Sequence, residues 1–456
     1  MSTSQTLGGA TRCGRIIGPS LDKIIKNAAW RKHTYLVSSC KSVLDKLESL
    51  PDDFHDPSSV VSGLAASDAD SVLQPFLLSL ETAYSKVVEP SLDCAFKLFS
   101  LSILRGEIQS SKQDSILFKL VNAVSKVGAI AEEPIQLAVL RVLLAAVRSP
   151  CILIRGDCLL HVVKTCYNIY LGGLSGTTQI CAKSVLAQMM LVIFTRSEED
   201  SLDVSVKTIY VNELLTFTDK SVNEGSSVYF CQGFVNEVMA AGQGSPLPPP
   251  DVIQILLQNP ETETVMTPDS PSFRGYVANG EGDSETGDMS KVRQDAFLLF
   301  KNLCKLSMRF SSKENNDDQI MVRGKTLSLE LLKVIIDNGG SVWRTNESFI
   351  NAVKQYLCLS LLKNSAVSIM SIFQLQCAIF MSLLSKLRSV LKAEIGIFFP
   401  MIVLRVLENV LQPSYLQKMT VLNLLDKMSQ DPQLMVDIFV NYDCDVESSN
   451  ILERYY

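Results

Sequence analysis

The sequence is poor in the side chains that catalytic and metal sites use most often. It has three histidines, His33, His55 and His161, and none lies beside a serine or cysteine in a recognisable nucleophile arrangement. Cys158 and Cys166 flank His161, but a structural zinc site needs a fourth ligand and usually a second close pair. We therefore expect core thiols rather than a metal, no cofactor, and no catalysis by this chain alone.

Charged residues are also scarce, and the net charge of the chain is small. Charged residues make up 20% of the chain, and the net charge of -6 gives no general reason to bind nucleic acid. The 12 cysteines are scattered singly, without the short, even spacings of a disulfide framework, and residues 1–5 contain no signal-peptide apolar core. These absences favour a cytosolic, reduced protein with mostly buried free thiols.

No apolar run makes a convincing membrane span. The best candidate, the uncharged stretch between Lys363 and Lys386, is diluted by several serines and glutamines. Its apolar residues, such as Ile369, Ile372 and Phe373, recur at three- and four-residue steps. This spacing favours a core helix of a helical protein over a span.

Helical periodicity is what the sequence has in abundance. Apolar positions from Leu21 to Leu47 predict a first long helix that ends before Pro51. Pro134 suits the first turn of another helix, and Gly172-Gly173 suits the end of the one after it. Helices joined by short turns predict an all-α fold, an armadillo/HEAT-like α-solenoid of degenerate helix pairs in two blocks.

A polar stretch over 241–290, rich in Pro, Gly, Ser and acids, separates the two blocks, which we place at 1–240 and 291–456. Its composition predicts a disordered linker with one short helix over 252–257. Thr267 and Ser270 each precede a proline, so they are candidates for proline-directed phosphorylation. The alternative is an unmodified tether.

The first 46 residues are basic, with Lys23, Lys26, Arg31 and Lys32 among the cations. One interpretation is a solvated helix face. The other is a contact with an acidic partner or with anionic lipid.

The most informative segment lies close to the C-terminus. Asn441, Tyr442, Asp443, Cys444 and Asp445 directly follow an apolar helix. A helix C-terminus disfavours carboxylates unless they accept hydrogen bonds, so we expect backbone N–H groups, or an Arg or Lys, to bind them. The five residues, here called the acidic box, are either a capped turn that supports the local fold or also a docking surface.

The acidic box resembles the box that marks the domain upstream of the catalytic domain in large Arf guanine-nucleotide exchange factors. The closest resemblance is to the brefeldin-A-inhibited type of the trans-Golgi network, and the residues are most similar to those of its plant members. Residues 303–308, 327–332 and 346–358 resemble the same upstream domain. Residues 165–171, with the sequence Thr-Cys-Tyr-Asn-Ile-Tyr-Leu, resemble the dimerisation and cyclophilin-binding domain of that family.

This resemblance implies a regulatory, non-catalytic role in Golgi and endosomal vesicle traffic. It implies self-association as a homodimer, binding of Arf or Arf-like small GTPases, a cyclophilin as a further partner, and peripheral membrane contact at the trans-Golgi network or endosomes. It also implies that the acidic box docks the two helical blocks. The glutamate-bearing loop of the exchange domain is not found in this sequence, so we expect no nucleotide exchange by this chain alone. A generic solenoid adaptor unrelated to Arf is the alternative.

Overall fold

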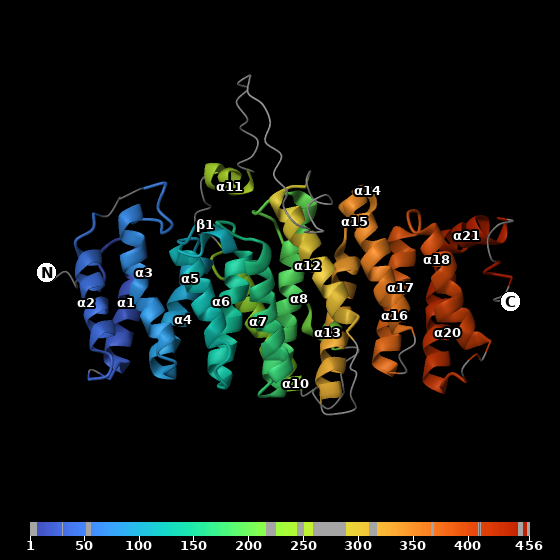
Figure 1. The fold of residues 1–456 in the computed structure, drawn as a ribbon, viewed down its shortest axis with the longest axis horizontal. Helices are drawn as coiled ribbons and strands as arrows, with labels where there is room; N and C mark the ends of the chain where they lie inside the picture. The colour runs from blue at the N-terminus through green and yellow to red at the C-terminus, as the bar shows by residue number, and fades with distance from the viewer. Residues whose placement is uncertain are drawn as a thin grey trace, which may run out of the picture.

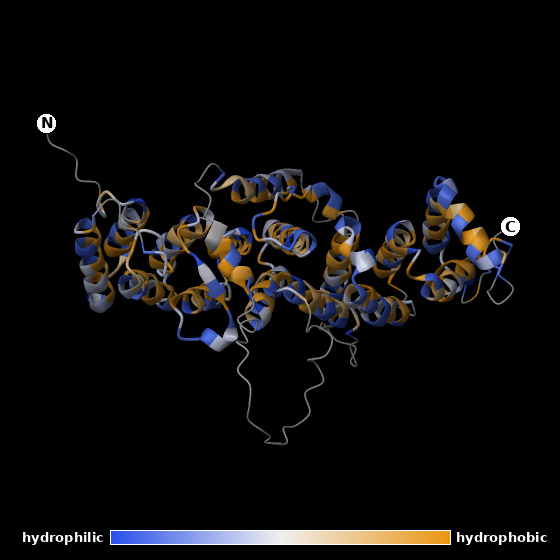
Figure 2. Ribbon diagram, turned by 90° about the horizontal axis from the view of Figure 1, so that it is seen from above, coloured by the Kyte–Doolittle hydropathy of each residue, from blue (hydrophilic) through white to orange (hydrophobic). Residues whose placement is uncertain are grey.

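The helices are stacked along one elongated row that runs broadly from the N-terminal part of the sequence to the C-terminal part (Figure 1). The computed structural model describes residues 7–29, 31–51, 56–215, 225–243, 250–258, 289–309, 317–365, 369–408, 410, 412–445 and 450–453. The predicted all-α solenoid is confirmed. Seen from above, many helices are viewed end-on, with much of their hydrophobic surface turned toward neighbouring helices (Figure 2).

Most helices in the first half of the row are 12 to 17 residues long, whereas α8 has 24 residues and α9 has four. Their bounds are α1 Arg12–Asn27, α2 Thr34–Glu48, α3 Ala66–Glu81, α4 Ser85–Ser100, α5 Ile116–Val127, α6 Glu133–Arg148, α7 Gly156–Gly172, α8 Gly176–Glu199, α9 Val211–Leu214 and α10 Gly225–Ala240. Pro134 lies in the first turn of α6, and α7 ends at Gly172, as the sequence predicts.

The single long helix expected from Leu21 to Leu47 is wrong, because the chain turns between α1 and α2. Ala28 adopts an extended conformation, and the N–H groups of Lys32 and His33 both donate to the carbonyl of Ala29. The two helices then pack against each other. Both carry apolar residues at the same three- and four-residue steps, so periodicity runs through the turn without a visible break.

Two short strands, β1 Gly106–Ile108 and β2 Ile152–Ile154, pair in parallel beside α5 and α6. A short helix, α11 Pro250–Leu257, forms inside the predicted linker, and Leu256 packs with Leu153 and Val292. The expected short helix is thus present and docked, because its apolar residues cover the β2 edge. The prediction of disorder for 259–288, with Thr267 and Ser270, lies outside the described residues.

The second half continues the row. Its bounds are α12 Lys291–Ser307, α13 Asp317–Asn338, α14 Val342–Thr345, α15 Glu347–Ala352, α16 Cys358–Asn364, α17 Met370–Leu387, α18 Lys392–Phe399, α19 Arg405–Leu407, α20 Tyr415–Ser429 and α21 Pro432–Ile438. Three π-helical turns, Val353–Leu357, Pro400–Leu404 and Phe439–Asp443, join α15 to α16, join α18 to α19, and extend α21. Pro400 has no N–H to donate, which accounts for one of these irregular turns.

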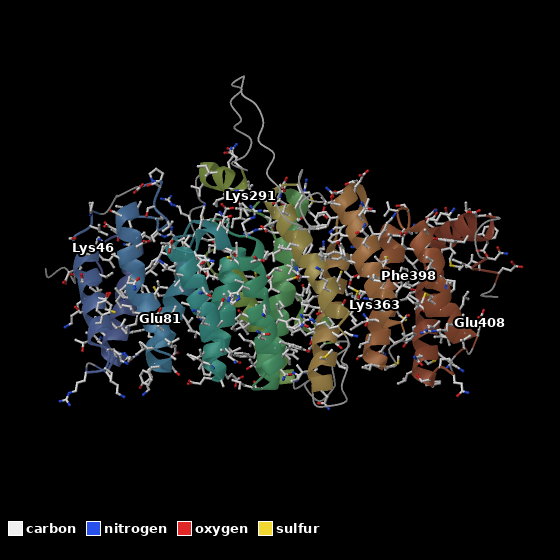
Figure 3. The ribbon with its side chains drawn as sticks, in the orientation of Figure 1. Lys46, Glu81, Lys291, Lys363, Phe398 and Glu408 are labelled. Atoms are coloured by element: carbon white, nitrogen blue, oxygen red, sulfur yellow. The ribbon has the colours of Figure 1, made fainter. Side chains whose placement is uncertain are left out.

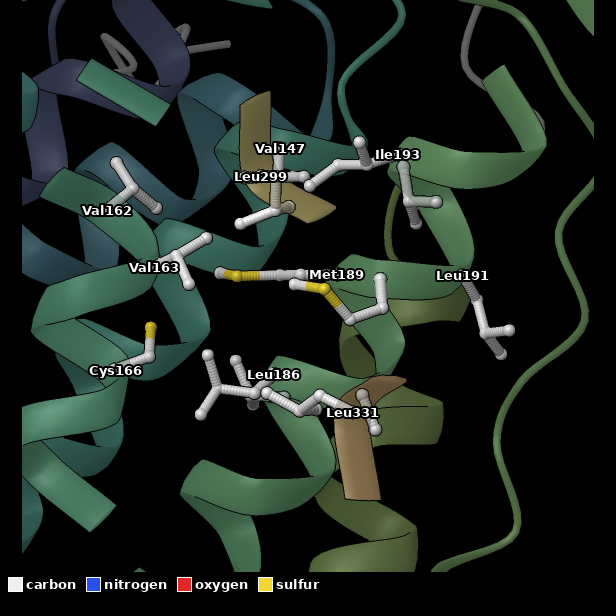
Figure 4. Close-up of a cluster of buried hydrophobic side chains, with 14 of the residues drawn as sticks. Val147, Val162, Val163, Cys166, Leu186, Met189, Leu191, Ile193, Leu299 and Leu331 are labelled. Carbon is white, nitrogen blue, oxygen red and sulfur yellow. The ribbon is translucent and has the colours of Figure 1, made fainter. Parts of the chain in front are cut away.

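The two halves share one hydrophobic core. Figure 4 shows Leu186 and Met189 of α8, Val163 of α7, Leu299 of α12 and Leu331 of α13 in one cluster. α10 ends at Ala240 and α12 begins at Lys291, and α7 and α8 on one side pack directly on α12 and α13 on the other. The row is therefore continuous through its middle.

Two helices, α8 and α17, are long and apolar enough to cross a membrane by length and composition. The apolar window of α8 is 89% buried within the protein and that of α17 is 56% buried. We therefore interpret both as core helices, as the sequence predicts for the run that becomes α17.

Candidate interaction sites

The contact between the halves is built on α8, which touches both α12 and α13. Nζ of Lys183 in α8 lies 2.5 Å from Oε1 of Glu330 in α13, and both side chains are almost fully buried. Burial lowers the pKa of Lys183 and raises that of Glu330, and the attraction between the two charges opposes both shifts. This pair is a fixed, water-poor link between the two halves.

A second charged network joins the start of α7 to the start of α12. Arg155 Nε lies 2.9 Å from Asp295 Oδ2, and the Gly156 N–H donates to Asp295 Oδ1 at 2.8 Å. Burial raises the pKa of the Asp295 carboxyl to about 6, against the opposing charge of Arg155. Lys291, labelled at the top of α12 in Figure 3, reaches both Glu107 of β1 and the carbonyl of Leu256 in α11. The network thus ties four elements together.

The C-terminal end of α8 holds the turn before α14. Glu198 accepts hydrogen bonds from the N–H groups of Gly340 and Val342, at 2.8 and 3.1 Å. Next to it, the Trp343 ring lies 5.7 Å from the ring of Phe194 in α8 and 4.9 Å from that of Phe300 in α12. Aromatic pairs at such distances are favourable beyond the area they bury.

The segment 165–171 lies on α7 and faces α13. Tyr167 donates its hydroxyl hydrogen to the carbonyl of Gly324 and also contacts Ser328. A Cβ at Gly324 would lie 2.8 Å from the Tyr167 oxygen, so any larger residue there requires the Tyr167 side chain to shift. The motif that carries the family resemblance in the first half therefore lies in the contact with the second half.

Sequence reasoning missed this central interface. The sequence feature that could have indicated the interface is a charged residue inside an apolar helix. Lys183 is flanked by the uncharged run of α8, and Glu330 interrupts an apolar stretch of α13. A buried, paired charge is expected at an interface rather than on a solvated face.

The acidic box lies at the far end of the row from α1, next to α18 and α21. Tyr442 is buried and donates to the carbonyl of Lys392 at 2.8 Å, and Lys392 Nζ lies 3.0 Å from Asp445. Asp443 accepts from the N–H groups of Leu452 and Glu453, at 3.1 and 2.9 Å. The expected hydrogen bonds to backbone N–H groups and to a lysine are present.

The other two box residues lie on the surface. Asn441 donates to the carbonyl of Asp437, and the thiol of Cys444 is exposed. The hydrogen bonds of the box and its ion pair with Lys392 join it to other residues of the second half. The contacts of α7 and α8 with α12 to α14 join the two halves within the chain.

A groove of about 550 Å³ opens beside the box, between the end of α17, the start of α18 and α21. Asn441 and Tyr442 line it together with Arg344, Arg388 and Lys392. Arg388 Nε binds Asp437 at 2.6 Å, which holds the pKa of that carboxyl below its usual range. The box thus forms one wall of a polar, largely basic groove.

The N-terminal cations lie at the opposite end of the row. Lys23, Lys26, Arg31 and Lys32 are exposed, and Lys26 pairs with Asp22 at 2.6 Å. Arg31 and Lys32 lie in the turn between α1 and α2, where no helix covers them among the described residues. The described residues contain no cluster of three metal-ligating side chains, and Cys158 contacts Ser110 instead.

Comparisons with known proteins match two domain models to this chain. The dimerisation and cyclophilin-binding domain of Mon2/Sec7/BIG1-like proteins matches residues 11–201, and the HUS domain of the same proteins matches residues 292–451. The first match covers the helices from α1 to α8, and the second covers those from α12 to the box.

The similar relatives are exchange factors. The chain is 68% identical over 454 residues to brefeldin A-inhibited guanine nucleotide-exchange protein 1 of Arabidopsis thaliana, covering 100% of this chain and 26% of that protein. It is 42% identical over 493 residues to protein 3 of the same plant, covering 97% of this chain and 28% of that protein. Identity to the human protein 1 is 28% over 569 residues, covering 95% of this chain and 31% of that protein. The chain spans about a quarter to a third of the length of these relatives.

Proposed function

Because the chain belongs to the Mon2/Sec7/BIG1-like family through both of these domains, we propose that it is a regulatory and protein-interaction region of an Arf guanine-nucleotide exchange factor. It acts in vesicle traffic at the Golgi and endosomes. The observation that supports this best is the shared core, which fixes the two regulatory domains in one solenoid. A solenoid of this length offers extended surfaces to other proteins.

Four kinds of partner follow from this proposal. The name of the first domain points to a second copy of the chain and to a cyclophilin. The exchange-factor relatives point to an Arf or Arf-like GTPase. Peripheral contact with trans-Golgi network or endosome membranes from the cytosol is the fourth.

The purified chain tests this proposal directly. We expect it to sediment as a dimer and to retain an Arf or Arf-like GTPase, with a preference for one nucleotide state. We expect no acceleration of nucleotide release from Arf by the chain alone. Capture of no Arf-type GTPase in either nucleotide state, by a chain that is folded by circular dichroism, would contradict the proposal.

The acidic box is proposed as a docking surface for a partner. Asp445 offers the sharper test, because it pairs with Lys392 near the surface, whereas Asp443 accepts hydrogen bonds from the backbone N–H groups of Leu452 and Glu453. Asp445→Ala should weaken partner capture or self-association without lowering thermal stability. Asp426→Ala, an exposed carboxylate on α20, is the matched control. Equal binding by both variants would leave the box as a capped turn alone.

The N-terminal cations are proposed to contact anionic lipid or an acidic partner. The double variant Arg31→Glu/Lys32→Glu should lower cosedimentation with vesicles that contain anionic lipid, and added salt should lower that of the parent chain. Lys97→Glu is the control, because Lys97 is an exposed lysine of α4 in an i,i+4 pair with Asp93. Unchanged cosedimentation of the double variant would indicate a solvated face.

Phosphorylation of Thr267 and Ser270 remains part of the proposal for the segment between α11 and α12. Phosphate there adds charge to an acidic stretch and changes its attraction to basic surfaces of the row. Phosphopeptide mapping of protein isolated from cells tests this, and recovery of both sites only in unmodified form argues against it.

A further inference from the structure

Two cysteines from distant parts of the first half meet at the contact between α8 and α10. The Sγ atoms of Cys181 and Cys231 lie 2.7 Å apart, and both residues are fully buried. Carbon atoms pack at roughly 3.5–4.0 Å, and sulfur is the larger atom, so this separation is shorter than ordinary packing. The backbones of the two helices therefore bring the sulfurs to within bonding reach of each other.

The surroundings keep the two sulfurs in register. Oγ1 of Thr177 in α8 lies 2.8 Å from Oγ of Ser227 in α10, one turn before the cysteines. Beyond them, Arg148 of α6 donates to the carbonyls of Val238 and Ala241 at the end of α10. With contacts on both sides of Cys231, α10 has little freedom to slide along α8.

We propose that Cys181 and Cys231 are an intramolecular disulfide site, at which oxidation converts two thiols into a covalent cross-link between α8 and α10. The oxidant is a peroxide or a low-molecular-weight disulfide. The cross-link closes a loop across 50 residues of sequence. It fixes α10 to the helix on which both halves of the protein pack.

With hydrogen peroxide the step balances in two stages. One sulfur attacks a peroxide oxygen, so that an S–O bond forms, the O–O bond breaks and one water leaves behind a sulfenic acid. The second sulfur then attacks the sulfenic sulfur, so that the S–S bond forms, the S–O bond breaks and a second water carries away the thiol proton. Two electrons pass from the sulfurs to the peroxide. With a low-molecular-weight disulfide, the same two electrons reduce it to two thiols.

The reaction in the native protein is expected to be slow. The sulfur of Cys231 and burial together raise the pKa of the Cys181 thiol well above its usual range, so little thiolate is present. The outer side of α10 is open to solvent, however, with Tyr229 83% exposed. Local opening of α10 gives a small oxidant access to the two sulfurs. The site therefore responds to sustained oxidation rather than to brief pulses.

An equilibrium experiment tests the proposal without depending on access. A Cys444→Ser background removes the exposed thiol. This protein is refolded in buffers of graded reduced and oxidised glutathione, quenched with acid, alkylated and digested. Mass spectrometry should find a peptide pair linked through Cys181 and Cys231, two hydrogens lighter than the sum of the thiols. Cys166 and Cys377, which are also buried, should be recovered as alkylated thiols.

A second measurement ties the cross-link to the fold. Native protein held in peroxide should gain several degrees in Tm, dithiothreitol should reverse the gain, and Cys231→Ser should abolish it. Cys181→Ala provides the same test should Cys231→Ser fold poorly. Recovery of Cys181 and Cys231 as free thiols or as separate glutathione adducts at every buffer ratio would overturn the proposal.

Discussion

The middle of the row and its C-terminal end place their helices in opposite surroundings. In α8, 18 of 24 residues are buried, among them Lys183, Gln188 and Arg196. In α21 only Leu434 and Ile438 are buried. Just beyond them, Phe439 and Val440 are about half exposed. A helix enclosed by neighbours buries its polar side chains, whereas an end helix leaves even apolar residues open to solvent.

This difference predicts where substitutions should cost most. A buried polar group exchanges its hydrogen bonds with water for fixed partners, and removing one partner leaves the other unsatisfied. At the end of the row, water can replace a lost partner. Changes to polar residues around α8 should therefore be severe, and similar changes near the box should be mild.

Arg196 provides the largest expected effect. Its buried guanidinium donates to the carbonyls of Leu202, Val147, Arg148 and Ser149. Arg196→Met removes the guanidinium donor from all four carbonyls, although that of Ser149 also accepts from the Ile152 N–H, and the change should lower the free energy of unfolding by about 4 kcal/mol. Urea denaturation followed by circular dichroism measures it. Arg12→Met, at an exposed arginine that donates to one carbonyl, should cost less than about 1 kcal/mol. Equal losses would remove the distinction between enclosed and open helices.

The pair that links the halves comes next. Glu330→Leu leaves the Lys183 ammonium buried without its carboxylate and should cost about 3 kcal/mol. The double variant Lys183→Met/Glu330→Leu should recover most of that loss, because apolar side chains of similar volume often replace a buried pair without cost. Equilibrium unfolding of the two single variants and the double variant completes a cycle. If the loss in the free energy of unfolding of the double variant equals the sum of the losses of the two single variants, the two charges act independently.

The fold was far easier to predict from the sequence than the interface. Three- and four-residue spacing is a local signal, so the α-solenoid, the start of α6 and the end of α7 follow from it. The turn between α1 and α2 carries no glycine or proline over 28–33, so nothing local marks it. The contact of α7 and α8 with α12 and α13 joins residues more than 100 positions apart, and periodicity says only that a face is buried, not by what.

For the acidic box, the sequence predicted the local features but not the surroundings. Its family resemblance and its need for hydrogen-bond donors both follow from its residues, and the donors are present at Leu452, Glu453 and Lys392. The adjoining groove was not predicted, because Arg344 and Arg388 come from helices that only the fold brings to Tyr442.

Two glycine-to-alanine substitutions should change the stability by smaller amounts and in opposite directions. Gly324→Ala places a methyl group against the Tyr167 hydroxyl at the interface, so it should cost about 1 kcal/mol despite the better helix propensity of alanine. Gly233→Ala, on α10 with nothing within 4 Å of the added Cβ, should stabilise by about 0.5–1 kcal/mol. Thermal unfolding of both variants checks the signs. A stabilising Gly324→Ala would indicate that α7 and α13 are free to separate.

The smallest effect is expected at the box, where it carries a pH signature. Burial, with the nearby carboxylate of Glu394, raises the pKa of Tyr442 to about 12. The unfolded chain loses this proton near pH 10, whereas the folded chain keeps it. The contribution of Tyr442 to stability is therefore fully present below pH 10 and falls as the pH rises from 10 to 12. Tyr442→Phe, which loses the bond to the Lys392 carbonyl, should cost about 0.5 kcal/mol at neutral pH. The difference in near-ultraviolet tyrosinate absorbance between the parent and Tyr442→Phe chains follows this one group. Ionisation of Tyr442 at pH 10 in the folded chain would show that the box is as open to water as the surface around it.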